Sequence, residues 1–161
     1  MTIDKDEMEA IFPDFSPIIQ EFEDMIQWKT VGKKKVPEPR PGLDENFDRA
    51  NRAVEKVKHE IEEYLDTIKK ELKTKNINYS TGSKLFRYEI EVADELCNKV
   101  PDHYSNTSNV KGRKRFQTDE LRQMIETLEE KEEIFKDALV PLLREMFKKF
   151  YENREIFTRA V

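Results

Sequence analysis

Two long segments of the sequence, 44–75 and 118–161, repeat apolar residues at every third or fourth position among charged ones. That spacing puts the apolar side chains on one side of an α-helix, so each segment is predicted to be a long amphipathic helix. At about 1.5 Å per residue, the first helix would reach roughly 45 Å, much longer than a helix of a small domain. Pro141 is expected to kink the second helix or to break it into two. The apolar positions of the first helix are Phe47, Ala50, Val54, Val57, Ile61, Leu65, Ile68 and Leu72.

The intervening segment, 76–117, changes to a period of two, which is typical of β-strands. Residues 77–80 alternate, 81–83 form a turn, and 85–92 form a half-buried strand, followed by a loop over 94–104 and a short strand or loop over 105–110. In the strand 85–92, one face is predicted to carry Phe86, Tyr88, Ile90 and Val92, and the solvent face Arg87, Glu89 and Glu91. Two long helices flanking such a segment can bury their apolar stripes only by lying antiparallel. The predicted fold is therefore mainly α with a small β tip (α+β), a long antiparallel helical stalk carrying a small antiparallel sheet.

The N-terminal segment, 1–30, is predicted to be helical, with a short helix over 4–12 and a second one over 16–28 that starts at Ser16-Pro17. The stretch 31–43 is rich in proline and lysine, and we expect an extended connector there without secondary structure. Its three lysines, 33–35, are interpreted as solvated linker charge, with a nucleic-acid patch as the alternative.

The composition excludes several classes of protein. Charged residues make up 39% of the chain and hydrophobic residues 37%, which allows only a thin core. No apolar run is long enough to span a membrane, and the first residues do not resemble a signal peptide. A single cysteine, Cys97, excludes an internal disulfide framework and fits a reducing compartment. We find no phosphate-binding glycine loop, catalytic triad or cysteine cluster, and His103 has no companion at ligand spacing, so neither an enzyme nor a metal site is expected.

The charge is distributed unevenly along the chain. Residues 75–115 contain eight Lys and Arg against five Asp and Glu, which gives this segment a net charge of +3. The remaining residues carry a net charge of −8, so the whole chain has −5. A basic middle between acidic arms indicates an anion-facing tip on a solvated support.

The strongest candidate site is the stretch Lys111-Gly112-Arg113-Lys114-Arg115, in which four cations surround one glycine. Such crowded charges repel one another unless an anion lies opposite, and the glycine lets the backbone approach a phosphate closely. The turn Gly82-Ser83-Lys84 offers the same donors. Because the segment has neither a recognition helix nor an array of Asn and Gln to read base edges, the expected mode is sequence-independent contact with the nucleic-acid backbone.

Several motifs, in order along the chain, resemble the MutS family of DNA mismatch-recognition proteins, and within it the lever–clamp region of the eukaryotic MutS homologue 6 group. The basic stretch leads through Phe116 into Thr118-Asp119-Glu120-Leu121, which is similar to the entry into the second clamp helix of that family. The other matching motifs are Phe12-Pro13-Asp14-Phe15, Gly42-Leu43-Asp44-Glu45-Asn46-Phe47-Asp48, and Arg87-Tyr88-Glu89-Ile90-Glu91-Val92.

The resemblance implies a nuclear protein whose two subunits, this one and another MutS homologue, enclose double-stranded DNA. The clamp tips would touch phosphates, the levers would transmit motion, and Arg115 and Phe116 would be structural. By motif position, the DNA-binding residues would be Ser83, Lys84, Lys111, Gly112, Arg113 and Lys114.

The chain departs from the family because it carries neither an ATPase domain nor a mismatch-binding domain, and, as a mild change, it has Phe116 where the family has tyrosine. It is therefore expected to have no enzymatic activity and no cofactor. Residues 150–152 match the Phe-x-Glu wedge motif of the family's mismatch-binding domain, but they lie on a predicted helix, so the match is interpreted as a coincidence. Two other interpretations remain open. One is a coiled-coil-like scaffold that binds a protein partner through its apolar seam, and the other is an RNA-binding hairpin, which would need exposed aromatic residues on the sheet.

Overall fold

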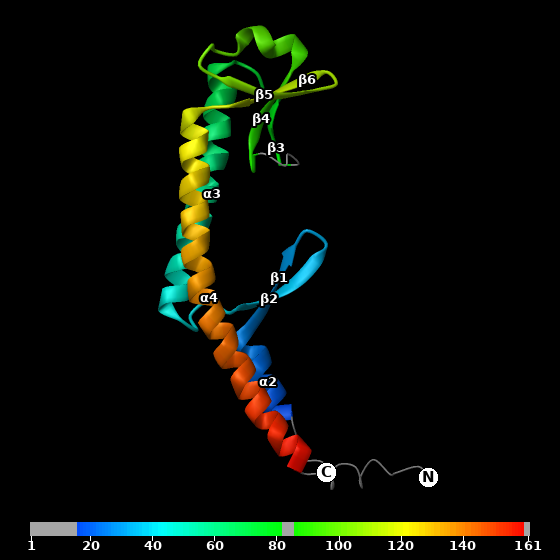
Figure 1. Ribbon diagram of the computed structural model, residues 1–161, viewed down its shortest axis with the longest axis vertical. Coiled ribbons are helices and arrows are strands. Elements are labelled where there is room, and N and C mark those ends of the chain that lie inside the picture. The colour runs from blue at the N-terminus through cyan, green and yellow to red at the C-terminus, as the bar shows by residue number, and fades with distance from the viewer. Residues whose placement is uncertain (1–15, 82–85, 160–161) are drawn as a thin grey trace, which may run out of the picture. The chain divides into compact units, whose positions relative to one another are not determined.

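The computed structural model describes residues 16–81 and 86–159, which form long helices and two small antiparallel sheets (Figure 1). The predicted α+β class is confirmed. The chain divides into two compact units, Met1–Arg49 with Phe135–Val161, and Ala50–Ile134. The elements are α2 (Ser16–Met25), β1 (Ile26–Val31), β2 (Lys34–Pro39), α3 (Glu45–Glu71), β3 (Ile77–Ser80), β4 (Glu89–Ala93), η1 (Asp94–Lys99), β5 (Ser105–Val110), β6 (Arg113–Gln117) and α4 (Asp119–Arg159). The helix predicted over 4–12 lies outside the described residues.

Both long helices begin at the residues that the sequence indicated. Asp44 caps α3, since its Oδ1 accepts a hydrogen bond from the Phe47 N–H at 2.8 Å. Thr118 caps α4 in the same way, accepting from the Leu121 N–H at 3.1 Å. Pro141 was expected to kink the second helix or to break it into two; α4 continues through Pro141, so the break does not occur. The predicted stripe of α3 is buried at Phe47, Ala50, Val54, Val57, Ile61, Ile68 and Leu72, whereas Leu65 is half-buried.

Within the unit Ala50–Ile134, α3 and α4 run side by side in opposite directions (Figure 1). The Tyr64 hydroxyl of α3 and the Thr118 hydroxyl at the start of α4 are 2.8 Å apart and share a hydrogen bond. Ile61, Leu121 and Leu128 are at most 1% exposed. The stripe of α4 is thus buried at Leu121 and Leu128, whereas Met124 and Ile125 are half-buried.

The sheet of this unit has the strand order β3-β4-β6-β5, with all neighbours antiparallel. Tyr79 of β3 donates a hydrogen bond to the Ile61 carbonyl at 2.7 Å and so ties the sheet to α3. The inner strand β4 corrects one prediction. It begins at Glu89 rather than at residue 85, and Glu89, expected on a solvent face, is only 1% exposed. The cause is non-local, because Thr107 of β5 and Arg115 of β6 cover that face and contact the carboxylate of Glu89.

The segment between β4 and β6 contains a short helix and a strand. Residues 94–104, expected to be a loop, contain the short helix η1. The stretch 105–110, for which a strand or a loop was expected, is the strand β5, with a register irregularity between Asn106 and Ser108.

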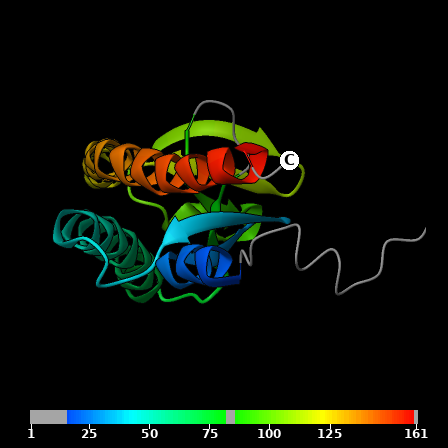
Figure 2. The ribbon, with the colours of Figure 1, turned by 90° about the horizontal axis from the view of Figure 1, so that it is seen from below.

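The other unit contains a β-hairpin that the sequence analysis missed. The helix expected to run to Trp28 ends at Met25, and the predicted connector contains the strand β2, paired with β1 (Figure 2). Gly32 has a φ of 62° at the first position of the two-residue turn, as a type II′ hairpin turn requires. Ile26 and its cross-strand partner Pro39 are both buried, which anchors the base of the hairpin.

Candidate nucleic-acid interface

The basic stretch lies at the turn between β5 and β6. Val110 pairs with Arg113, which leaves Lys111 and Gly112 as a two-residue turn, and all four residues are exposed. Gly112 has a φ of 78°, the value that the second central position of a type II turn requires. Its carbonyl accepts a hydrogen bond from the Asp94 N–H at 3.1 Å, so the turn is fixed to η1. An added Cβ at Gly112 would meet open space, so the glycine is required for its backbone conformation.

The four cations of this stretch fall into two pairs with different roles. Arg113 and Arg115 both bind Glu91 of β4, the first through Nη1 at 2.7 Å and the second through Nε at 3.1 Å. The hydrogen bond from Arg113, together with the one from Arg115, lowers the pKa of Glu91 below its usual value. The like charges that were expected to need an external anion are thus partly neutralised by a carboxylate of the protein itself. The side chain of Arg115, for which the resemblance implied a structural role, is 22% exposed and contacts Glu89 and Glu91 of β4.

Lys111 and Lys114 are the available cations of this turn. Both are exposed, and neither has an ion pair with any residue in 16–81 or 86–159. Strand alternation directs Lys114 to the opposite face of β6 from Arg113 and Arg115. Burial raises the pKa of the Cys97 thiol, and the positive charge of Lys114 partly offsets that rise. The structure therefore brings Lys111, Gly112, Arg113 and Lys114 together, but it leaves only the two lysines without a carboxylate.

The second predicted turn, which contains Ser83 and Lys84, lies outside the described residues. Its contribution to a binding surface remains a prediction.

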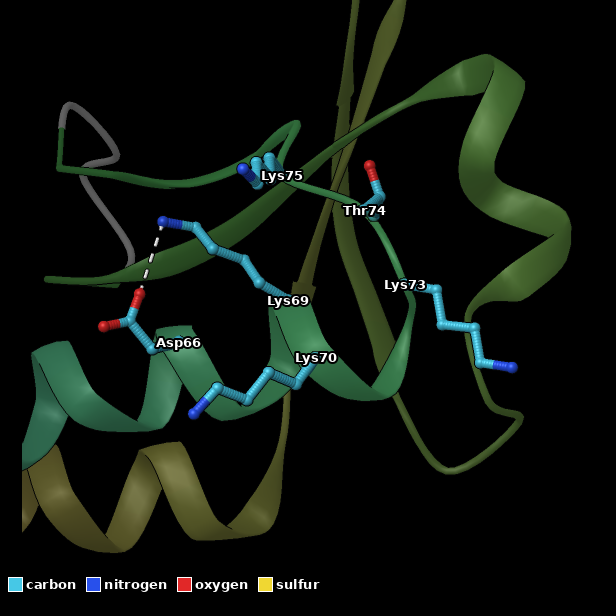
Figure 3. Close-up of a pocket in the computed structure, with 6 residues that line it drawn as sticks. All are labelled: Asp66, Lys69, Lys70, Lys73, Thr74 and Lys75. Carbon is cyan, nitrogen blue, oxygen red and sulfur yellow. Dashed lines mark ion pairs between the residues drawn. The ribbon is translucent and has the colours of Figure 1, made fainter.

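A second basic cluster, which the sequence analysis missed, lies at the end of α3. It lines an open pocket of about 560 Å³ (Figure 3). Lys69 is paired with Asp66 at 3.6 Å. In Figure 3 the side chains of Lys69, Lys70 and Lys75 extend toward one side of the helix end, whereas Lys73 points to the other. The residues that line the pocket are Asp66, Lys69, Lys70, Lys73, Thr74 and Lys75.

The signal for this cluster was present in the sequence as four lysines within seven positions. Of these four lysines, only Lys75 falls within the basic segment 75–115. What the sequence did not show is how the helix ends. Lys73 has a φ of 50°, and the Lys73 and Thr74 N–H groups bond to the carbonyls of Lys70 and Lys69. This is a Schellman motif, which turns the chain sharply and gathers the lysines around the helix end.

The strand register relates the two basic regions. Ile77, the first residue of β3, pairs with Val92, and Val92 pairs with Lys114 at the beginning of β6. The chain that enters β3 from Lys75 and the turn between β5 and β6 therefore lie at the same end of one sheet. The lysine cluster follows α3 at this end, so both regions belong to one basic end of the unit Ala50–Ile134.

The described residues form neither a metal site nor a membrane-spanning helix. Within 16–81 and 86–159, no three His, Cys, Asp or Glu side chains are grouped so that they could hold a metal ion. None of the helices in the described part of the chain is long and apolar enough to cross a membrane.

Comparison with known proteins agrees with the fold and with the motifs. Residues 42–134 match the family described as MutS family domain IV. The chain is 30% identical to the DNA mismatch repair protein Msh6 of Gallus gallus over 93% of its own length and 11% of that protein. It is 28% identical to the MSH6 protein of Arabidopsis thaliana over 92% of this chain and 11% of that protein, and 24% identical to Homo sapiens Msh6 over 95% and 11%.

The resemblance to the lever–clamp region of MutS homologue 6 is thereby confirmed, although the chain spans only about a tenth of the length of these relatives. The match to the family covers more than half of the chain and includes both helices and the sheet of the unit Ala50–Ile134. This chain belongs to the MutS family.

Proposed function

We propose that this chain contributes to DNA mismatch repair by holding the backbone of double-stranded DNA at its basic end, without reading sequence. The observation that carries the proposal is the pair Lys111 and Lys114, exposed beside the Gly112 turn and without a carboxylate among the described residues. Phosphate contacts of this kind position a protein on DNA and carry no sequence information.

The predicted contacts keep different roles within this proposal. Lys111 and Lys114 would neutralise phosphates directly, and the N–H of Gly112 would donate to a phosphate oxygen. Arg113 would chiefly hold the turn through Glu91, with its 55% exposed side chain adding positive potential. Ser83 and Lys84 would supply a second contact of the same chemistry.

The rigidity of the support favours this function. The turn is fixed to η1 through Gly112 and to β4 through Glu91, so little conformational entropy would be lost when a phosphate binds. The scaffold alternative needs an apolar seam open to a partner. In the unit Ala50–Ile134 most of that seam is inaccessible to a partner, because Ile61, Leu121 and Leu128 are buried and Met124 and Ile125 are half-buried.

We also propose that the chain acts in the nucleus alongside a second MutS homologue, which would close around the same duplex. Catalysis is not part of the proposal. The basic end offers exposed ammonium groups and a turn glycine, which suit the binding of phosphate groups.

The test is binding to a short duplex across a salt series, with wild type compared with Lys111→Ala/Lys114→Ala. With three to four phosphates contacted, the logarithm of the association constant should fall with the logarithm of salt concentration at a slope of about −3. Because each lost phosphate contact removes about 0.9 from that slope, the double variant should retain a slope of only about −1.

A matched control is Lys136→Ala/Lys149→Ala, which removes two exposed charges from α4 in the other unit. It should leave the slope within about 0.5 of the wild-type value if binding is local to the basic end. Equal losses in both double variants would show that only net charge matters, and would refute the proposal.

A further inference from the structure

The β1–β2 hairpin is not explained by DNA binding at the basic end. In the described part of the chain, β1 and β2 form a two-stranded sheet with no third strand. Trp28 is 62% exposed, Val31 59% and Val36 43%. Strand alternation places Trp28 on one face of the hairpin and Val31 and Val36 on the other, so both faces expose apolar side chains. An isolated two-stranded hairpin is only marginally stable in water, which indicates that this one has a binding partner.

The two edges of this small sheet differ in their hydrogen-bonding capacity. The two-residue turn makes Val31 and Lys34 a hydrogen-bonded pair, so the pairing alternates along the ladder. Pro37, opposite Trp28, and Pro39 therefore occupy non-hydrogen-bonded positions, where the backbone nitrogen points away from the partner strand. Because proline has no N–H, the outer edge of β2 lacks donors at both positions.

The outer edge of β1 has the donors that β2 lacks. By the same alternation, the N–H and C=O groups of Trp28 and Thr30 point outward from β1. The carbonyl of Ile26 is already bonded to Arg40 Nε at 2.7 Å. Trp28 and Thr30 thus present a short open ladder, which is the kind of edge that an added strand pairs with.

The charge around this edge indicates what kind of strand would fit. The ten residues 28–37 contain four lysines and no acidic residue. Glu38, which follows, is only 6% exposed and contacts Lys29 at 3.8 Å. Lys33, Lys34 and Lys35 are exposed at the turn. The hairpin therefore combines an open ladder, an exposed indole and a strongly positive tip.

We propose that the outer edge of β1 binds an extended, acidic protein segment as a third strand. Apolar side chains at alternate positions of that segment would pack beside Trp28, and its carboxylates would lie near Lys33, Lys34 and Lys35. A nucleic acid fits the lysines but not the rest of the surface. It would leave the outward N–H and C=O groups of Trp28 and Thr30 unpaired, and it would find one exposed aromatic residue on the hairpin where stacking along a strand uses several.

The single tryptophan of the chain provides the measurement, because Trp28 lies on the proposed surface. The probe is a terminally blocked peptide of alternating valine and glutamate, titrated into the full chain at low salt. We expect a saturable blue shift of the tryptophan emission as the indole leaves water. A valine–lysine peptide and a valine–glutamate peptide interrupted by proline should produce no shift.

Two variants separate backbone pairing from charge. Thr30→Pro removes an outward N–H at a position that does not bond to β2, so the hairpin is retained while the edge is blocked. It should weaken peptide binding by at least about tenfold. Lys33→Ser/Lys34→Ser/Lys35→Ser should weaken binding by a similar factor at low salt and have little effect at high salt.

Several outcomes would overturn the proposal. These are no emission shift with the valine–glutamate peptide, equal binding of the valine–lysine peptide, or full affinity in a folded Thr30→Pro variant, checked by far-ultraviolet circular dichroism. A shift produced only by a single-stranded oligodeoxynucleotide would assign the hairpin to nucleic acid instead.

Discussion

At the scale of single residues, Glu91 decides which cations of the basic turn are available. It holds both Arg113 and Arg115, although only Arg113 was predicted to contact DNA. The sequence showed four clustered cations. It could not show that the register between β4 and β6 places the carboxylate of Glu91 beside Arg113 and Arg115. Lys111 remains available to bind an anion because it lies in the turn, and Lys114 because it lies on the face of β6 opposite to Arg113 and Arg115.

Replacing Glu91 by glutamine should destabilise the protein by about 1–2 kcal/mol at neutral pH, a range reduced because Arg113 is half exposed. Arg113 first, and then Arg115, holds the pKa of Glu91 below its usual value. The charged form therefore stabilises the fold above the unfolded-state pKa of about 4.3, and this contribution is lost as the pH falls through the lower folded-state value. Urea unfolding at pH 7 and pH 3 measures the difference.

The stability gap between wild type and Glu91→Gln should be largest at pH 7 and shrink at pH 3, because the carboxyl is protonated in the unfolded chain below its unfolded-state pKa of about 4.3. A glutamate exposed on α3, Glu62, provides the control, since Glu62→Gln should change stability by less than about 0.5 kcal/mol at either pH. An equal gap at both pH values would mean that shape, and not charge, accounts for the role of Glu91.

At the scale of elements, local periodicity predicted the long helices well. The stripe from Phe47 to Leu72 is buried almost as predicted, because the regular period of a long helix determines which side chains share one side of it. The β1–β2 hairpin was missed for a physical reason. The prolines, among them Pro37 and Pro39, were interpreted as preventing secondary structure in this segment. In the hairpin both occupy non-hydrogen-bonded positions, where a missing N–H removes no hydrogen bond between the two strands. That depends on the register, which the local sequence did not specify.

The end of α3 shows a local conflict between sequence and structure. Lys73 adopts a left-handed conformation with a φ of 50° at the position where helices usually end in glycine. Lys73→Gly should therefore stabilise the protein by about 0.5–1 kcal/mol, because glycine has no Cβ to strain there. Thermal unfolding would detect this as a higher Tm.

The matched control for this change is Lys70→Gly, three residues earlier and inside α3. The same substitution should cost roughly 0.5–1 kcal/mol in this last turn of α3, since glycine has a lower helix propensity than lysine. Destabilisation by both changes would indicate that the Lys73 side chain makes a contribution larger than its backbone strain.

At the scale of the whole molecule, a net charge of −5 conceals a basic segment over 75–115. Folding adds Lys69 and Lys70 to that segment, because the helix end that carries them lies at the same end of the sheet as the Lys111-Gly112 turn. Sequence counting could find the asymmetry but not its full extent, since α3 and β6 are far apart in the chain.

If a duplex contacts the whole basic end, Lys70→Ala/Lys75→Ala should reduce the salt slope by up to about 2, as two more phosphate contacts are lost. These two lysines are chosen because, in the described part of the chain, neither is paired with a carboxylate, whereas Lys69 is paired with Asp66. The same salt series, with Lys136→Ala/Lys149→Ala as control, measures the effect. A slope that changes only with Lys111→Ala/Lys114→Ala would confine the contact to the turn. A slope that changes only with Lys70→Ala/Lys75→Ala would place DNA on the end of α3 and contradict the proposed role of the turn.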